Sequence, residues 1–214
     1  MNLVKNLEQR TEEWKQIRKG SIGGTRVKTV MAKNNLPLID ELIAEKHTEL
    51  IEETFVNDAM QRGIDLEPFA IKEFEDRTEN KVDTFGLVTN EKFPGCHLSP
   101  DGLILDGSGV PLSGVEVKCP STKKHVEYIR TNRVPAEYKY QVYHYFTICE
   151  TIETMFFVSY DPRFEVRPVH IVQVNREDIA DQLEEFETKL LKFMESYPLG
   201  AQSQYTYKRK ECHI

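Results

Sequence analysis

Apolar positions in the first third of the chain recur every three to four residues, which is the spacing of one face of an α-helix. Pro68 interrupts the last of these patterns, so we expect the helix to break there or to restart with Pro68 in its first turn. Thr25 is the expected N-cap of the second helix, after the S-I-G-G-T segment at 21–25. The predicted helices cover residues 11–19, 25–33, 38–50 and 55–79.

From residue 81 the pattern changes to short apolar segments bounded by Gly, Pro and Asp, which is typical of strands. The D-G-S-G segment at 106–109 indicates a turn between two of them. The predicted strands cover 81–89, 97–105, 113–119, 153–160 and 168–174, and the remaining helices cover 122–131, Pro135 to about Glu150, and about 176–196.

This order of elements predicts an α/β (mixed α+β) fold with a central mixed β-sheet and helices on both faces. The 214 residues contain no internal repeat and no Pro/Gly/Ser-rich linker, so we expect a single domain over 1–214. Residues from about 199 to 214 are predicted to form a polar tail.

Composition narrows the class of protein. With 39% hydrophobic and 10% aromatic residues the chain is too apolar to be disordered. No apolar run reaches the roughly 18 residues of a membrane helix, and the start does not resemble a signal peptide, so we expect no membrane and a cytoplasmic location. The four cysteines are scattered without paired spacing, which favours free thiols over a zinc or iron–sulfur site: Cys96, Cys119, Cys149 and Cys212.

The charge of the chain does not by itself decide whether the protein binds nucleic acid. The 28 Lys and Arg against 35 Asp and Glu give a net charge of −7, which argues against nucleic acid, but the distribution is uneven. Residues 5–33 carry eight basic and three acidic side chains (+5), 118–140 carry six and two (+4), and 40–79 carry four and thirteen (−9). Solvated helix faces produce such blocks by chance, and charge alone favours that interpretation.

The most informative stretch is S-P-D-G-L at 99–103, followed after the predicted turn by G-V-E-V-K-C-P at 114–120. Side chains alternate along a strand, so Glu116 and Lys118 share one side while Val115 and Val117 face the core. If the turn pairs the two strands, Asp101 lies near Glu116. The two carboxylates with the Val117 carbonyl then suit Mg²⁺ or Mn²⁺.

A lysine beside such a cluster can hold or deprotonate an attacking water and offset charge on a phosphoryl group, so the pattern suggests phosphodiester hydrolysis. The spacing by itself favours a surface hairpin in which Asp101, Glu116 and Lys118 form an exposed salt bridge. The bracketing apolar residues, with Pro100 and Pro120 at the strand ends, favour the catalytic interpretation.

Pro100-Asp101 and Glu116-Val117-Lys118 resemble the motif of the PD-(D/E)xK nuclease superfamily, whose core order α-β-β-β-α-β matches the elements predicted here. The chain also resembles, more narrowly, the lambda exonuclease and YqaJ-type viral recombinase family. The segments that carry this resemblance are 13–27, 62–70, 98–103, 116–120, 141–145 and 160–163.

The resemblance implies a role for each matching residue. Asp101, Glu116 and the Val117 carbonyl would bind metal, and Lys118 would be the catalytic lysine. Glu67 would help bind a second metal ion, and Gln141 would orient water or a phosphate oxygen. A 5′-phosphate at a DNA end would be held by Arg18, Gly23, Gly24 and Thr25. The remaining aromatics and histidines of these regions are expected in the core or in structural hydrogen bonds: Trp14, Tyr140, Tyr143, Tyr145, Phe146, His125 and His144.

The resemblance implies a restriction-endonuclease-like core and an Mg²⁺-dependent exonuclease with two ions per site, in which Mn²⁺ could substitute. It would degrade the 5′ strand of linear double-stranded DNA and leave a 3′ single strand for phage-type recombination. A homotrimeric ring, a single-strand annealing protein as partner, and a phage or prophage origin in a bacterial cytoplasm are implied as well. A site- or structure-specific endonuclease and a non-catalytic DNA-binding protein are the alternatives.

Overall fold

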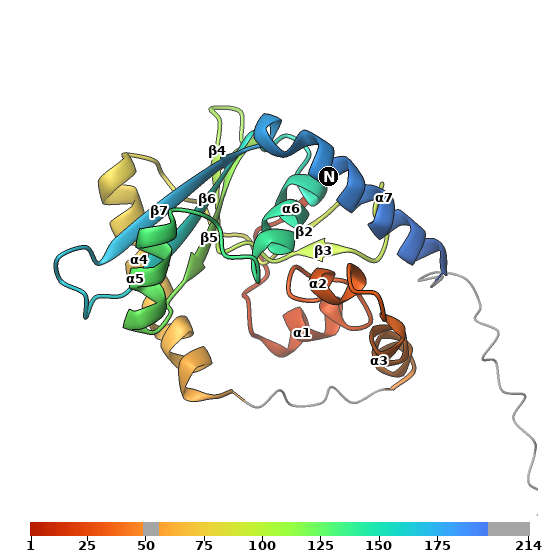
Figure 1. Cartoon of the computed structure of the whole chain (residues 1–214). Coiled ribbons are helices and arrows are strands. Elements are labelled where there is room, and N and C mark those ends of the chain that lie inside the picture. The colour runs from red at the N-terminus through yellow and green to blue at the C-terminus, as the bar shows by residue number, and fades with distance from the viewer. Residues whose placement is uncertain (49–55, 197–214) are drawn as a thin grey trace, which may run out of the picture.

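The computed structural model describes residues 1–48 and 56–196 (Figure 1), so the predicted tail, Cys212 and the ends of two predicted helices facing residues 49–55 lie outside the described residues. Its elements are β1 (Asn2–Val4), α1 (Glu12–Arg18), α2 (Val27–Val30), α3 (Leu36–His47), α4 (Asp58–Thr78), β2 (Leu87–Thr89), β3 (His97–Leu98), β4 (Gly102–Leu105), β5 (Pro111–Lys118), α5 (Thr122–Thr131), α6 (Lys139–Ile148), β6 (Thr154–Tyr160), β7 (Val169–Asn175), the 3₁₀ turn Glu177–Ile179 and α7 (Ala180–Ser196).

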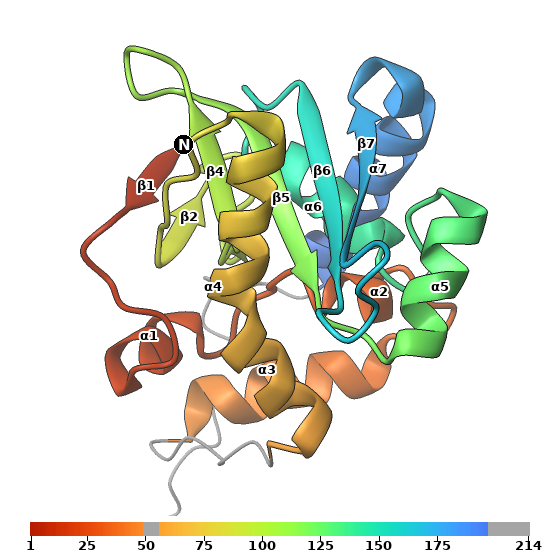
Figure 2. The same cartoon turned by 90° about the vertical axis from the view of Figure 1, so that its left-hand side faces the viewer.

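A four-stranded mixed sheet in the order β4-β5-β6-β7 forms the centre of the fold, with β5 and β6 parallel and the outer pairs antiparallel. Side chains alternate between its faces: Val158 packs with Phe74 of α4, whereas the adjacent Phe157 packs with Tyr128 of α5. Helix α4 therefore covers one face, and α5 and α6 cover the other (Figure 2). This confirms the predicted α/β class.

A second, three-stranded antiparallel sheet, β1-β2-β3, was not predicted. The segment 97–105, expected to be one strand, is divided at residues 99–101: β3 joins this sheet and β4 joins the central one. Pro100 cannot donate to a strand ladder, which favours an interruption there. Only the last three residues of the predicted strand 81–89 are extended, as β2, and β1 was missed because three residues are too few to show a period.

Helix α4 runs unbroken through Pro68, so the predicted break at that residue is wrong. Proline cannot donate a hydrogen bond to the carbonyl four residues earlier. Burial of Ala70 and Phe74 against the central sheet supplies the stability that the local pattern could not show. The prediction for Thr25 is also wrong, because α2 is a single turn whose N-cap is Arg26, and Thr25 lies in the preceding turn.

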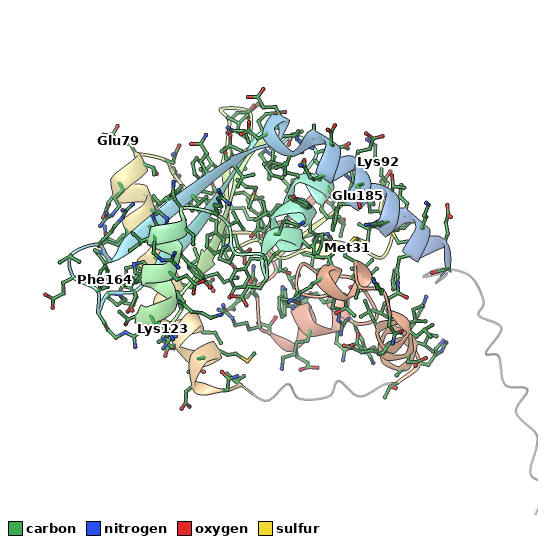
Figure 3. All side chains as sticks on the ribbon, viewed as in Figure 1. Met31, Glu79, Lys92, Lys123, Phe164 and Glu185 are labelled. Carbon is green, nitrogen blue, oxygen red and sulfur yellow. The ribbon has the colours of Figure 1, made fainter. Side chains whose placement is uncertain are left out.

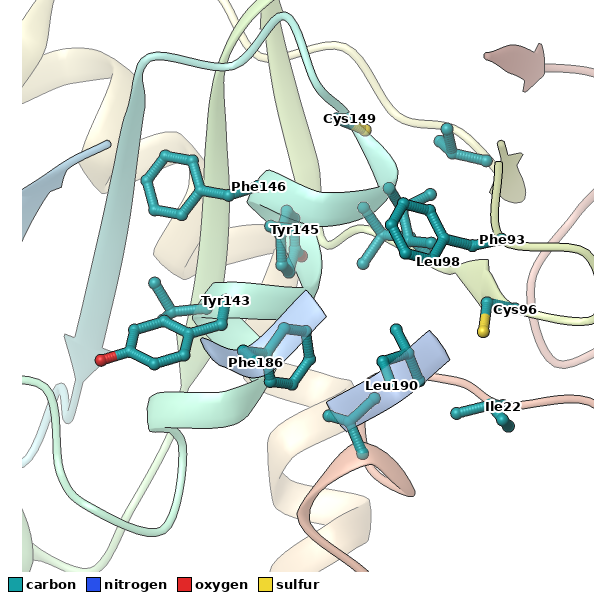
Figure 4. Close-up of a cluster of buried hydrophobic side chains, with 14 of the residues drawn as sticks. Ile22, Phe93, Cys96, Leu98, Tyr143, Tyr145, Phe146, Cys149, Phe186 and Leu190 are labelled. Carbon is teal, nitrogen blue, oxygen red and sulfur yellow. The ribbon is translucent and has the colours of Figure 1, made fainter. Parts of the chain in front are cut away.

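The main core surrounds α6, which is buried along almost its whole length (Figure 4). Tyr143, Tyr145 and Phe146 belong to this cluster, as predicted, and Tyr140 stacks on Phe186 of α7. The helix begins at Lys139 rather than at Pro135, because residues 135–138 form a turn closed by the Tyr138 amide and the Pro135 carbonyl at 2.9 Å.

The structure also bears on the cysteines and on membrane-spanning helices. Cys96, Cys119 and Cys149 are free thiols, as expected. Among the described residues, no helix combines the length and the apolar character required to cross a membrane.

Candidate active site

The hairpin of β4 and β5 brings Asp101 beside Glu116, as predicted. Gly102 pairs with Val115 in the antiparallel register, so the next residues along each strand are neighbours. The Oδ2 atom of Asp101 accepts a hydrogen bond of 2.7 Å from the Val117 amide. The predicted turn is present, with the Asp106 carboxylate accepting from the Ser108 and Val110 amides, so a short-range turn fixes the register of the acidic pair.

Glu116 is only 1% exposed, and its two oxygens have different surroundings. Oε1 contacts the Lys118 ammonium, whereas Oε2 is buried without a hydrogen-bond partner among the described residues. Burial, and then the charge of Asp101, raise the pKa of Glu116 to about 7. An unpartnered buried carboxylate oxygen is a costly feature that suits a cation.

Asp101 and Lys118 complete the charge pattern of the cluster. Burial raises the pKa of Asp101, although the Lys118 charge and the Val117 amide oppose this. Burial by itself would lower the pKa of Lys118, but the two carboxylates outweigh it and raise the pKa. Lys118 therefore stays an ammonium. One cation beside two desolvated carboxylates leaves the cluster short of positive charge.

The donor set fits a hard divalent cation with carboxylate and carbonyl oxygens from Asp101, Glu116 and Val117. In residues 1–48 and 56–196, no group of three or more His, Cys, Asp or Glu side chains is placed to hold a metal ion. The candidate thus consists of two carboxylates and main-chain oxygen, with the unpartnered Glu116 Oε2 as its most specific feature.

Glu67 lies on α4 and forms a 2.7 Å ion pair with Arg10. Burial, and then the charge of Asp101, raise its pKa, while Arg10 lowers it. Glu67 is therefore close enough to Asp101 to interact electrostatically, but in this structure its carboxylate is bound to Arg10.

Tyr145 connects α6 to the acidic pair and was predicted only as a core residue. Its hydroxyl oxygen accepts from the Asp101 amide at 3.0 Å, and the hydroxyl donates to the Val115 carbonyl at 3.2 Å. The side chain is completely buried, so it fixes the backbone of Asp101 to β5. Tyr145 is four residues after Gln141, so the two side chains lie on one face of the helix. This spacing is the sequence signal that could have identified Tyr145 as a site residue.

Arg18 belongs to a second cluster of polar side chains, together with Trp14 and His97. Its guanidinium lies over the Trp14 ring at 3.6 Å from the ring centroid, and its Nε donates to His97 Nε2 at 2.8 Å. Burial, and then the charge of Arg26, lower the pKa of Arg18 to about 10, so it remains charged at neutral pH. Within the part of the chain that the structure describes, Arg18 forms no ion pair with a carboxylate, unlike Arg26, which pairs with Glu41 and Glu45.

The structure brings Gly23 and Gly24 to this cluster. A Cβ atom at Gly23 would lie 2.7 Å from His97 Nε2 and 3.4 Å from Arg18 Nη2, so only glycine fits there. At Gly24 a Cβ would lie 3.2 Å from Gln141 Cγ, so the Gln141 side chain lies against this loop. Thr25 is exposed at the turn that follows.

The segment 97–101 joins the Arg18 cluster to the acidic pair. His97 contacts Arg18 at one end, and Asp101 belongs to the acidic pair at the other. Adjacent residues of α6 hold both ends, because His144 Nε2 donates to the His97 carbonyl at 2.8 Å and Tyr145 binds the Asp101 amide. His144 is thus structural, as predicted, and so is His125, which bonds to Ser159 and to the Arg167 carbonyl.

Comparison with known proteins agrees with this geometry. Residues 13–151 match the family model described as the YqaJ-like viral recombinase domain. No curated protein matches the chain. The crystal structure of an alkaline exonuclease from Laribacter hongkongensis is similar at 32% identity, with a TM-score of 0.78, over 88% of this chain and 93% of that one.

Two further structures are similar. The Laribacter hongkongensis exonuclease in complex with dAMP has a TM-score of 0.77 at 32% identity, again over 88% of this chain and 93% of that one. A phage-related exonuclease from Haemophilus somnus covers 85% of this chain and 96% of its own at 13% identity, and its TM-score of 0.55 indicates a shared fold alone. By the matched region and the identity together, this chain belongs to the YqaJ-like viral recombinase family.

Proposed function

We propose that this protein is a divalent-metal-dependent exonuclease with a PD-(D/E)xK site, which degrades linear double-stranded DNA from 5′-phosphorylated ends in the 5′ to 3′ direction. The observation that carries the proposal is the buried Glu116 Oε2 without a partner, beside Asp101 and the Lys118 ammonium. Direction and substrate rest on the family resemblance.

In this proposal Asp101, Glu116 and the Val117 carbonyl hold Mg²⁺, with Mn²⁺ as a substitute, and Glu67 takes part at a second ion after leaving Arg10. The metal supplies charge neutralisation at the phosphate and an acidified water. Lys118, protonated at Nζ, donates to a non-bridging phosphate oxygen as negative charge builds there. Gln141 orients water or a phosphate oxygen from α6.

The 5′-phosphate binds at Arg18, with the backbone of Gly23 and Gly24 and the Thr25 hydroxyl as further donors. A desolvated guanidinium without a carboxylate partner is expensive unless an anion joins it. A terminal phosphate carries more charge than an internal diester and suits a planar donor fork. The dAMP complex of the Laribacter hongkongensis exonuclease supports a nucleoside monophosphate as the product class.

The two basic segments support a DNA-facing side. Helices α1 and α5, which belong to these segments, lie on either side of the carboxyl end of β5 (Figures 1 and 2). Phosphate contacts with such segments supply sequence-independent affinity. A homotrimeric ring around the DNA, a single-strand annealing protein as partner and action in the cytoplasm of a bacterial host complete the proposal.

The test uses Asp101→Asn, Glu116→Gln and Lys118→Met, which preserve side-chain size. Each should lower the rate on linear duplex DNA by at least a hundredfold, because each removes a ligand charge or the ammonium beside the phosphate. Lys72→Met, at an exposed lysine of α4 paired with Asp76, is the matched control and should keep the wild-type rate.

Removal of metal by EDTA should stop digestion, and Mg²⁺ should restore it. Labels on 5′ or 3′ ends report polarity, and a covalently closed circle should survive. Cleavage of the circle would favour the endonuclease alternative. If Asp101→Asn, Glu116→Gln or Lys118→Met kept a cleavage rate within about tenfold of the wild-type rate, a difference of about 1.4 kcal/mol, the chemistry would have to lie elsewhere.

A further inference from the structure

We infer that His97 is a positioning residue that orients Arg18 without neutralising it, and that it thereby sets the preference of the enzyme for 5′-phosphorylated ends. This rests on the proposed function, since it concerns the same end-binding residues. His97 was not among the site residues that the sequence analysis predicted.

The hydrogen bonds around His97 form a closed ring that determines its protonation. Arg18 Nε–H donates to His97 Nε2 at 2.8 Å, so Nε2 carries no proton. Ser21 Oγ donates to the Arg18 carbonyl at 2.5 Å, so the hydroxyl oxygen is an acceptor toward His97 Nδ1 at 2.8 Å. The imidazole is therefore the neutral Nδ1–H tautomer, and each donor in the ring meets one acceptor.

The surroundings keep this imidazole neutral. His97 is 4% exposed, and burial, followed by the charge of Arg18 and by His144, holds its pKa well below the usual value. Protonation would place an N–H of Nε2 against the Arg18 Nε–H. Among the described residues, the groups that face the ring are Arg18, Arg26, the Ser21 hydroxyl and His144, and none of them would stabilise an imidazolium.

A neutral acceptor has a specific advantage at this position. A carboxylate would fix Arg18 equally well but would cancel its charge, as Glu45 does for Arg26. The imidazole fixes the Nε edge, and the Trp14 ring fixes the plane, while the guanidinium retains its full charge. The Nη side then faces Gly23, whose missing side chain leaves room beside Arg18 Nη2.

The experiment compares His97→Leu, which removes the acceptor at similar volume, with His97→Gln, which restores a neutral acceptor. The measured quantity is the ratio of kcat/KM on 5′-phosphate ends to kcat/KM on 5′-hydroxyl ends. For His97→Leu we expect this ratio to fall about tenfold, mainly through a higher KM for phosphorylated ends, because the guanidinium loses its fixed orientation. His97→Gln should retain most of the ratio.

A double-mutant cycle with Arg18→Ala separates positioning from a structural role. Arg18→Ala should bring the ratio close to one, and the addition of His97→Leu should reduce it no further, since the two residues act as one unit. The inference would be overturned if His97→Leu lowered kcat/KM equally on both kinds of end. It would also be overturned if the double variant lowered the ratio by the product of the two single effects. If His97→Leu does not fold, Ser21→Ala, which removes the acceptor for Nδ1–H, should lower the ratio in the same direction, and an unchanged ratio there would count against His97.

The outcomes also separate this inference from the proposed function. A wild-type enzyme without preference for 5′-phosphate, or an Arg18→Ala variant that keeps the preference, would contradict the assignment of Arg18 itself. The end-binding site would then be sought among Lys19, Arg26 and Lys28. A normal Arg18 result with an unchanged ratio in His97→Leu would contradict the role of His97 alone.

Discussion

Glu116 and Asp161 are both only 1% exposed, yet their pKa values change in opposite directions. Burial, and then the charge of Asp101, raise the pKa of Glu116 to about 7, and the contact with Lys118 does not outweigh them. Burial would also raise the pKa of Asp161, but hydrogen bonds from Arg163 and Thr122 outweigh it and lower the pKa to about 2. Glu116 is the acid that we propose binds metal, whereas Asp161 is held by Arg163 and Thr122 and stabilises the fold.

This difference predicts how Asp161 contributes to stability. Its folded-state pKa lies below the unfolded value near 4, so its stabilisation is complete above that pH and is lost as the pH falls toward 2. Asp161→Asn should lower the free energy of unfolding at pH 6, and the deficit relative to wild type should shrink between pH 4 and 2. Urea unfolding at several pH values measures it.

Thr122→Val removes one of the donors to Asp161 and should show a smaller deficit with the same pH dependence. A deficit for Asp161→Asn that stayed constant from pH 6 to pH 2 would contradict the role assigned to the Asp161 carboxylate.

Helix α4 contains two residues that oppose helix formation, Gly63 and Pro68, and it is nevertheless continuous. The helix is held by its buried face, with Ala70 and Phe74 against the central sheet. Gly63 has no such packing reason, because a Cβ atom there would meet no atom of the described residues within 4 Å.

Gly63→Ala should therefore raise the free energy of unfolding by about 0.5 to 1 kcal/mol, the difference between glycine and alanine inside a helix. The matched comparison is Gly86→Ala, where a Cβ would lie 1.9 Å from the Leu7 carbonyl oxygen. That change should destabilise the fold by about 1 to 3 kcal/mol. Chemical denaturation of both variants gives the two values. If both variants changed the free energy of unfolding by the same amount and in the same direction, the space around each glycine would not explain the changes.

Charge is unevenly placed over the whole molecule. Glu79, which follows α4, and Glu185 on α7 lie at the periphery, away from the carboxyl end of β5 (Figure 3). The basic segments of α1 and α5 flank that end instead. A net charge of −7 does not by itself exclude a DNA-facing side, because two acidic side chains near the site are already paired, Glu67 with Arg10 and Glu45 with Arg26.

We expect three copies of this chain to close into a ring. Cyclic assemblies are physically common for identical subunits, and a ring retains the DNA between successive cuts. Light scattering should give about three times the chain mass of 24.9 kDa. A mass of one chain at all concentrations would contradict the ring and leave the nuclease assignment in place.

Local patterns were sufficient for the acidic pair. The turn at 106–109 sets the register of a hairpin, and strand alternation places Glu116 and Lys118 on one side, so Asp101 and Glu116 meet through contacts between near neighbours in the chain. The helices flanking the sheet were likewise predictable, because each has an apolar face that only a sheet or another helix can bury.

The pairing of Arg18 with His97 could not be predicted in this way, because 79 residues separate them. It requires the loop at Ile22 to lie beside Cys96, where the Ile22 amide binds the Gly95 carbonyl and the His97 amide binds the Ile22 carbonyl. The division of 97–105 and the unbroken α4 depend in the same way on packing partners distant in the chain. Short-range hydrogen bonding and periodicity thus determined the acidic hairpin, whereas burial against distant segments decided the surroundings of Arg18 and the unpartnered state of Glu116 Oε2.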